Sequence, residues 1–165
     1  MSVAERAAEL SSAKRLQVGC SIVKKKIIFT GYNGTPTGWD NNCENIEWMT
    51  DAGSWLNAEE IITKWPFEGV YKDESGEERI NRYRLVTKPE VLHAEPNAIA
   101  KIAGSTISSK NATMFVTHAP CLDCAKLIYQ SRIKKVYYRD TYRDSSGVEF
   151  LIKSGVKVER FFNSR

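Results

Sequence analysis

The chain has 165 residues, enough for one domain with a sizeable core, and its 42% hydrophobic and 27% charged content is ordinary for a soluble globular protein. No apolar run approaches the roughly 18 residues of a membrane span, and the N-terminal residues lack a signal-peptide core, which predicts a cytoplasmic protein with no membrane partner. The net charge of +4 is mild; it suits small anionic substrates and does not argue for a polymeric nucleic acid.

The first predicted element is an amphipathic helix over residues 2–15, where apolar side chains recur at helical spacing. Polar residues gather at its end: Ser11, Ser12, Lys14 and Arg15. Two interpretations are open for this cluster. It is either a solvated helix terminus or a phosphate cradle, because serine hydroxyls and an arginine fork suit a phosphate monoester.

Two strands are expected next, at residues 18–24 and 27–32, paired as a hairpin through three consecutive lysines. The second strand runs into a glycine-rich turn at residues 31–38. Such residues form ordinary tight turns, but small side chains also let backbone amides approach a ligand closely. Both interpretations are open at this point.

Residues 40 to about 90 are expected to be an irregular insert. Within it, residues 57–65 look helical, and the segments 70–71 and 79–86 flank a polar turn, which predicts a hairpin. The tryptophans of this region are more typical of a core or a subunit interface than of base stacking.

The second half of the chain alternates between helices and strands, which implies parallel crossovers. Helices are expected over residues 94–104, 121–131 and 145–154, and strands over residues 112–117, 135–139 and 156–161. This pattern places His93 and Glu95 at one helix start and both Cys121 and Cys124 at another. The positive end of a helix dipole favours a carboxylate or a thiolate there.

His93, Cys121 and Cys124 supply three soft-to-borderline ligands, and three protein ligands with one open position are the arrangement of a catalytic zinc. Glu95 lies two residues after the histidine, where a carboxylate can take a proton from water and return it to a leaving group. The alternative is a closed structural zinc site with a fourth ligand among Cys20, Cys43 and His118. That alternative leaves Glu95 and Pro120 unexplained.

His-x-Glu followed by Pro-Cys-x-x-Cys is the signature of the zinc nucleoside deaminases. The chain resembles the deoxycytidylate deaminases of the zinc-dependent cytidine deaminase superfamily over most of its length, more weakly between residues 40 and 85. The resemblance rests on residues 17–19, 31–36, 93–99, 112–117, 119–126 and 133–136. The chain departs from the family at Pro96, in a short loop before Gln17, and in lacking the ligands of an additional zinc.

The resemblance implies a single domain over residues 1–165 with a three-layer α/β/α fold around a five-stranded mixed sheet. It implies a hydrolase that converts dCMP to dUMP with release of ammonia and so supplies dUMP for thymidylate synthesis. Zn²⁺ would be held by His93, Cys121 and Cys124, and Glu95 would carry protons to N3 and to the leaving amine.

The resemblance also suggests binding residues. For the substrate they are Asn33 at the sugar, Ala94 and Pro120 at the base edge, and Tyr142 nearby. The polar cluster after the first helix supplies the candidates for the phosphate, Ser11 and Arg15. Relatives are commonly homohexamers, activated by dCTP and inhibited by dTTP with Mg²⁺. The residues expected to carry that regulation are Asn33, Gly34, Thr35, Pro36 and Gly38.

Two rival functions stay open. One is deamination of another base, as in tRNA adenosine or guanine deaminases, or of another cytosine nucleotide such as dCTP. The other is a zinc module without enzymatic activity. A zinc measurement together with an ultraviolet assay on dCMP separates these possibilities.

Overall fold

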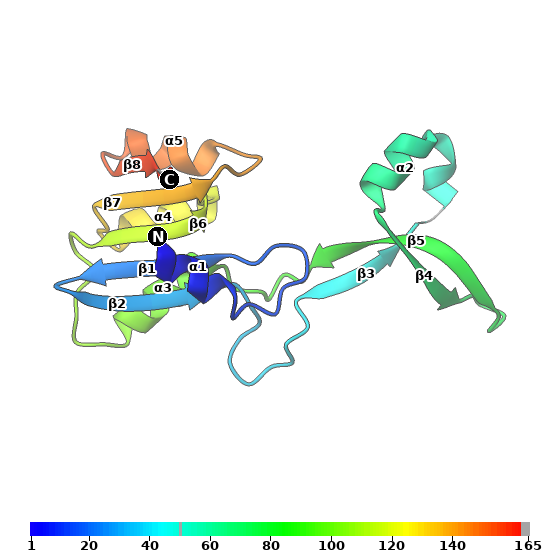
Figure 1. The fold of residues 1–165 in the computed structure, drawn as a ribbon, viewed down its shortest axis with the longest axis horizontal. Helices are drawn as coiled ribbons and strands as arrows, with labels where there is room; N and C mark the ends of the chain where they lie inside the picture. Colours follow the sequence, from blue (N-terminus) through cyan, green and yellow to red (C-terminus); the bar gives the residue numbers. More distant parts are fainter. Residues whose placement is uncertain (50, 163–165) are drawn as a thin grey trace. The chain divides into compact units, whose positions relative to one another are not determined.

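The computed structural model of the protein describes residues 1–49 and 51–162 and shows a five-stranded mixed sheet in the order β2-β1-β6-β7-β8 (Figure 1). Strand β1 pairs antiparallel with β2 and with β6, whereas β6, β7 and β8 are parallel. The strands are β1 (Gly19–Lys24), β2 (Ile27–Tyr32), β6 (Thr113–His118), β7 (Lys135–Asp140) and β8 (Lys157–Arg160). The mixed sheet and the parallel crossovers expected from the sequence are confirmed.

The hairpin of β1 and β2 turns at Lys25 and Lys26, whose φ angles are 49° and 66°. Two consecutive residues with positive φ form the turn whose twist matches that of the flanking strands. The pairing of Lys24 with Ile27 leaves a two-residue loop, as the run of three lysines suggested.

Helices cover both faces of the sheet, which gives the three layers. Helix α1 (Ser2–Ala8) lies on one face, with Ala4 and Ala7 buried beneath it (Figure 1). The other face carries α3 (Ala94–Ala103), α4 (Leu122–Gln130) and α5 (Ser146–Lys153).

The main core lies between the sheet and these three helices. The sheet contributes Cys20, Ile22, Met114, Val116 and Val136, and the helices contribute Ala94, Ala98, Ile102, Ala125, Ile128 and Leu151. Burying one large aliphatic side chain stabilises the fold by about 1.5–3 kcal/mol relative to leaving it exposed. Small alanines on α3 and α4 let both helices lie close to the strands, and this packing brings the starts of the two helices together.

This sheet and its helices belong to a first unit, Met1–Asn42 with Glu90–Arg165, whereas Cys43–Pro89 forms a second unit. The second unit is a three-stranded antiparallel sheet in the order β3-β5-β4, with the helix α2 (Ala58–Lys64) and a 3-10 turn, Asp51–Trp55. Its strands are β3 (Glu44–Trp48), β4 (Phe67–Lys72) and β5 (Glu78–Thr87). Aromatic contacts join Trp48, Tyr71, Tyr83 and Phe67 on one face of this sheet.

Two sequence expectations about these elements are wrong. The expected helix over residues 2–15 ends at Ala8. The amides of Leu10 and Ser11 donate to carbonyls only three residues back, and the Ser11 hydroxyl donates to the carbonyl of Asn33, so the helical pattern does not continue. The region expected to be irregular contains β3 and a complete sheet, although the expected hairpin and the helix at residues 57–65 are present. That residues 1–165 form one deaminase domain stays a prediction.

None of the helices that the structure describes is long and apolar enough to cross a membrane.

Candidate active site

The side chains of His93, Cys121 and Cys124 converge at the starts of α3 and α4, with their ligand atoms within 4.8 Å of one another. The Nδ1 atom of His93 lies 3.6 Å from Cys121 Sγ and 3.3 Å from Cys124 Sγ. Two ligands of a tetrahedral zinc ion, at ordinary Zn–N and Zn–S lengths, lie about 3.6 Å apart. The three donors therefore fit a zinc ion in both chemistry and spacing.

At the starts of α3 and α4, the ligand side chains are not used in capping hydrogen bonds and so can bind a metal ion. His93 is the N-cap of α3 and Cys121 is the N-cap of α4, and neither side chain makes a capping hydrogen bond. Both residues have the extended backbone conformation that is typical of an N-cap position. Cys124 and Glu95 lie within the first turns of these same helices, where the helix dipole favours negative charge.

Within the described residues, only these three donors gather around one point. Cys20, a candidate fourth ligand for a closed site, packs in the main core, and His118 lies beside Thr117 and Asp140. Cys43 belongs to the second unit. This arrangement favours an open coordination position over a closed structural site.

Glycine residues allow both helix starts to lie where they do. A Cβ atom on Gly31 in β2 would be 2.3 Å from the carbonyl oxygen of Ala94, so only glycine lets α3 pack this closely against the sheet. A Cβ atom on Gly147 in α5 would be 2.1 Å from the carbonyl oxygen of Pro120 and 2.7 Å from that of Cys121. The backbone within each metal-binding motif is therefore held by direct contact with a neighbouring element.

Each of the three metal-binding side chains shifts the pKa of its neighbours. Hydrogen bonds from Cys124 and then His93 lower the pKa of the Cys121 thiol to about 4, while the bond to Cys121 and burial raise the pKa of Cys124. The first proton therefore leaves Cys121. The pKa of His93 is raised, chiefly by its hydrogen bond to Cys121. Thiolate and imidazole groups bind a divalent metal ion in their deprotonated forms, so the metal ion can take the place of the protons that the cluster holds.

Glu95 is 4% exposed, and burial raises the pKa of its carboxyl group above the usual range. A buried carboxyl with a raised pKa exchanges protons more readily near neutral pH than an exposed one does. Glu95 follows His93 by two residues on the buried side of α3, where Ala94 and Ala98 are also buried. The carboxyl group therefore combines closeness to the metal ligands with protection from solvent.

The predicted sugar contact, Asn33, has a structural role in this molecule. Its Oδ1 accepts hydrogen bonds from Ser11 Oγ at 2.8 Å and from the amide of Val18 at 2.7 Å. Its Nδ2 donates to the carbonyl of Leu16 at 2.8 Å, and Gln17 Nε2 donates to the carbonyl of Ser11 at 2.7 Å. Asn33 thus holds the whole segment between α1 and β1, which includes the predicted phosphate residues.

The predicted regulatory turn is tied to the metal site through its backbone. Gly34 and Leu92 exchange two hydrogen bonds, of 3.1 and 2.9 Å, and Leu92 immediately precedes His93. The amide of Asn33 donates to Val18, so the amides of Asn33 and Gly34 are both engaged within the chain. A ligand that accepts hydrogen bonds from backbone amides of this turn would therefore meet residues after Gly34, such as Thr35 and Gly38, with Pro36 between them.

The other predicted binding residues are dispersed around the site. Ala94 and Pro120 are buried beside the metal ligands, and Tyr142 is half-buried in the loop between β7 and α5. Ser11 is buried against Asn33, whereas Arg15 is exposed. Their roles in binding a substrate stay predictions.

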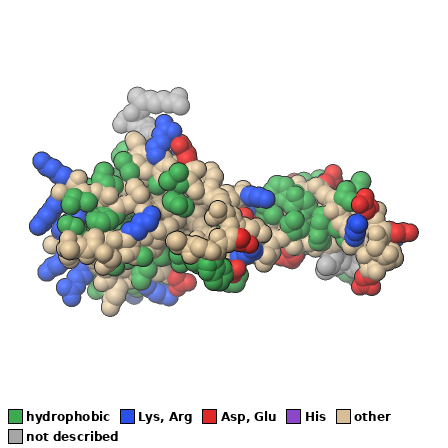
Figure 2. Space-filling model, turned by 90° about the horizontal axis from the view of Figure 1, so that it is seen from below, with side chains coloured by type: hydrophobic (Ala, Val, Ile, Leu, Met, Phe, Trp, Pro, Cys, Tyr) green, Lys and Arg blue, Asp and Glu red, His purple; other side chains and the backbone are tan. Residues whose placement is uncertain are grey.

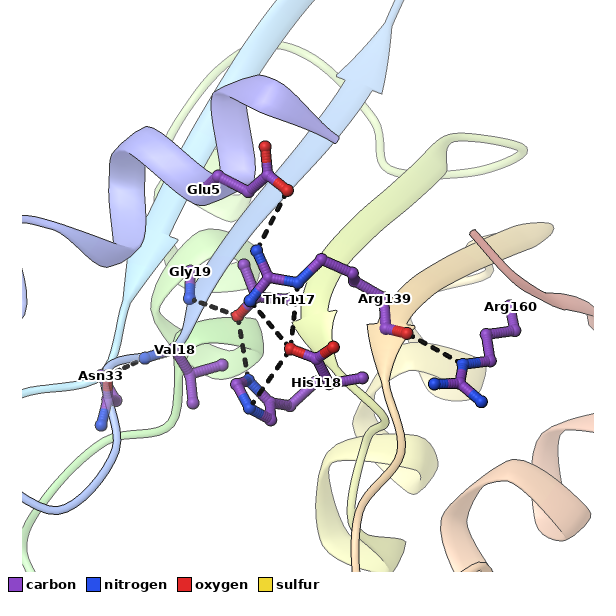
Figure 3. Close-up of polar contacts among 9 residues, drawn as sticks. Glu5, Val18, Gly19, Asn33, Thr117, His118, Arg139 and Arg160 are labelled. Carbon is purple, nitrogen blue, oxygen red and sulfur yellow. Dashed lines mark hydrogen bonds and ion pairs between the residues drawn. The ribbon is translucent and has the colours of Figure 1, made fainter. Parts of the chain in front are cut away.

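A polar network lies just before the Pro120–Cys121 turn, at the ends of β6 and β7 (Figure 3). Arg139 donates to Asp140 Oδ2 at 2.9 and 2.8 Å and to Glu5 of α1 at 3.0 Å. His118 Nε2 lies 3.7 Å from Asp140, and the amide of Ala119 donates to the carbonyl of Asp140 at 2.8 Å. This network connects α1 to the strand ends that lead into the cysteine ligands.

Sequence reasoning did not single out Gly147 or Asp140. The only signal for Gly147 is a glycine in the first turn of a predicted helix, a position where glycine is costly unless packing requires it. Asp140 looks like an ordinary residue at a strand end. Its contacts with His118 and with the amide of Ala119 are visible only once β6 and β7 are placed side by side.

Comparison with known proteins gives consistent results. The family model described as "Cytidine and deoxycytidylate deaminase zinc-binding region" matches residues 1–140. The deoxycytidylate deaminase of Enterobacteria phage T4 is 36% identical over 152 residues, which cover 86% of this chain and 77% of the phage protein. The human deoxycytidylate deaminase is 33% identical over 148 residues, covering 88% of this chain and 65% of the human protein.

Among solved structures, the dCMP deaminase of cyanophage S-TIM5 in complex with dCMP and dUMP is 36% identical, with a TM-score of 0.71. The match covers 97% of this chain and 92% of the cyanophage protein. From its sequence, its fold and its His-Cys-Cys cluster, this chain belongs to the cytidine and deoxycytidylate deaminase family.

Proposed function

We propose that this protein catalyses the hydrolytic deamination of dCMP: water adds at C4 of the cytosine ring, ammonia leaves, and dUMP remains. The observation that carries the proposal is the placement of buried Glu95 within two residues of a His-Cys-Cys cluster whose spacing fits zinc. The similarity to proteins named deoxycytidylate deaminase supports dCMP as the substrate.

Zinc would be held by His93, Cys121 and Cys124, and a zinc ion with one open position lowers the pKa of water toward neutrality. Glu95 would accept the proton of the attacking water and deliver protons to N3 and then to the departing amine. Two successive transfers require a carboxyl that both gains and loses a proton, and the raised pKa of Glu95 suits that role. The buried backbone around Ala94 and Pro120 would hold the base edge and exclude water.

Substrate positioning is proposed to depend on the segment that Asn33 holds. One donor hydrogen of the Asn33 amide remains for the sugar, since its other polar capacity is used by Ser11, Leu16 and Val18. Tyr142 lies on the loop that leads into α5 and would contact the nucleotide. Ser11 and Arg15 are proposed near the phosphate, with Ser11 acting mainly through Asn33 because its hydroxyl is already bonded.

The experiment combines metal analysis with an ultraviolet assay. The expected result is close to one catalytic zinc per chain and conversion of dCMP to dUMP, with a much lower kcat/KM for deoxycytidine, which lacks the phosphate. Assays with dCTP, adenosine and guanine distinguish the rival deaminases. A chain that binds zinc but converts none of these bases would be a zinc module without this activity.

We further propose that the enzyme is regulated, with dCTP as activator and dTTP with Mg²⁺ as inhibitor, in a cytoplasmic homohexamer. The physical support is the backbone link from Gly34 to Leu92, since movement of the turn would move the chain directly before His93. Two effectors change activity in opposite directions only if they prefer different arrangements of this turn. The test compares dCMP saturation curves with dCTP, with dTTP and with neither, all with Mg²⁺; three identical hyperbolic curves would contradict regulation.

A further inference from the structure

Positive charge is distributed unevenly along the chain. The first unit has 18 Lys and Arg residues against 10 Asp and Glu, a net charge of +8, whereas the second unit has 6 against 10, a net charge of −4. The mild net charge of the whole protein therefore conceals a basic first unit. Figure 2 shows Lys and Arg side chains gathered at the end of this unit that lies on the left.

These cations gather at one edge of the five-stranded sheet. Strand β1 ends where β6, β7 and β8 begin, because β1 runs antiparallel to β6 and the other two run parallel to it. The segments 24–27, 108–113, 130–135 and 152–157 all meet at this edge. They contain nine Lys and Arg residues and no Asp or Glu. We call this edge, formed by the four segments 24–27, 108–113, 130–135 and 152–157, the basic edge. It lies opposite the strand ends that lead to Cys121.

A cavity of about 350 Å³ opens within the basic edge. Its cationic lining residues are Lys110, Arg132 and Lys134, and no acidic residue lines it. Within the part of the chain that the structure describes, no carboxylate forms an ion pair with any of these three side chains. Three like charges around one hollow repel each other, and an anion in the hollow would relieve that repulsion.

The loops that carry these cations are firmly connected. The amide of Asn111 donates to the carbonyl of Arg132 at 2.8 Å, and the amide of Lys134 donates to the carbonyl of Ala112 at 3.0 Å. Arg132 itself has a φ of 59°, a left-handed conformation that is unfavourable for a residue other than glycine. Buried Ile133 lies between the two cationic residues and anchors this loop in the core.

The remaining lining residues suit a ligand larger than a single phosphate ion. Tyr129, a residue that is 46% exposed, contributes an aromatic ring, and Asn111, Gln130 and Ser154 contribute neutral polar groups. The cavity volume is at the lower end of the range for small-molecule sites, about 300–1,000 Å³. An arginine fork with two lysines matches the oxygens of a phosphate chain.

We propose that this cavity, lined by Lys110, Arg132 and Lys134, binds a phosphate-bearing small molecule of nucleotide size. The site is separate from the metal cluster and from the turn at residues 33–38, because it lies at the opposite ends of β6 and β7. It does not depend on the proposed deaminase activity, and its test reads binding directly.

The test is calorimetric titration of the zinc-loaded full chain with inorganic tripolyphosphate and, separately, with ATP. The test variant is Arg132→Gln with Lys134→Gln. The control is Lys25→Gln with Lys26→Gln, which removes the same charge from the same edge outside the cavity. We expect both probes to bind the natural protein, with a loss of affinity of at least about tenfold in the cavity variant and little loss in the control.

Other results would overturn the proposal. One is no binding of either probe, and another is an equal loss in both double variants, which would mean diffuse attraction to the whole edge. A third arm uses a short single-stranded oligonucleotide. Binding of the oligonucleotide without binding of ATP would assign the edge to nucleic acid instead. Circular dichroism checks folding, and Lys110→Gln, with its exposed side chain, tests the same cavity if the double variant does not fold.

Discussion

The two ends of the five-stranded sheet are built on different principles. At the metal end, the chain leaves β6 and enters α4 through buried Pro120 and partly buried Cys121, with Gly147 packed directly against their carbonyls. At the basic edge, the same strand begins after loops whose cationic side chains are exposed. Chemistry at the metal end depends on atoms held in place by contact, whereas binding at the basic edge would depend on the charges of exposed side chains around one cavity.

This difference predicts how each end tolerates substitution. A side chain that is added or removed at the metal end has no space to adjust, because interiors are closely packed. At the basic edge, the loss of one cationic side chain weakens the electrostatic attraction for an anion but leaves no packing defect. The variants below test this contrast in order of decreasing expected effect.

The largest effect is expected for Glu95→Gln. The amide keeps the size of the side chain but cannot carry a proton, so zinc should stay bound while kcat falls by about two to four orders of magnitude. Zinc content and the ultraviolet assay on dCMP measure the two quantities on the same sample. A rate near that of the natural protein would contradict the role given to Glu95.

Gly147→Ala should disturb the same end without touching a reacting group. The added Cβ would lie 2.1 Å from the carbonyl oxygen of Pro120, so the backbone must shift, at a cost of about 1–3 kcal/mol in the free energy of unfolding. Zinc affinity and kcat should fall together, because the shift moves Cys121.

The matched control is Gly104→Ala, at the end of α3, where an added Cβ would lie 3.6 Å from its nearest neighbour. This variant should be close to neutral in both unfolding and activity. Equal effects of the two alanine substitutions would show that the contact between Gly147 and Pro120 does not position the site.

Asp140→Asn tests the network that leads into the metal end. Arg139 holds the pKa of the Asp140 carboxyl below its usual range, with further lowering from His118 and Arg160. A carboxyl with a lowered pKa in the folded state stabilises the protein above the pKa of the unfolded state. That stabilisation is lost as the pH falls through the folded-state value.

The variant should therefore lose about 0.5–1 kcal/mol of unfolding free energy at neutral pH, as expected for a partly exposed ion pair. The difference from the natural protein should shrink in acid, below the usual range of an aspartate. Denaturant unfolding at several pH values measures it. Glu9→Gln, which breaks the more exposed pair with Arg6, should change stability less, and a larger change there would contradict the ranking.

The smallest effect is expected for catalysis by the cavity variant, Arg132→Gln with Lys134→Gln. Both residues lie at the opposite end of the sheet from the metal cluster, so kcat and KM for dCMP should remain within about twofold of the natural values when no other phosphate compound is present. A large loss of kcat would mean that the two ends are coupled, and the contrast drawn between them would fail.

Local patterns predicted much of this molecule correctly. The strand at residues 27–32, the helix expected over residues 94–104 and the hairpin through the lysines follow from short-range periodicity. The sequence also determined which residues supply the metal donors, because His93, Cys121 and Cys124 carry their chemistry in their side chains and occur in a recognisable spacing.

Tertiary structure decided what each position contacts. The helix from Ser2 ends at Ala8, and β3 exists only because it pairs with β5 far along the chain. Likewise Asn33 holds the Ser11–Val18 segment, and Gly147 supports Pro120 across a crossover. These contacts join residues far apart in sequence, and their free energy depends on close approach in space. A sequence pattern therefore identified the reacting groups, whereas the residues that hold them in place became visible only in the folded molecule.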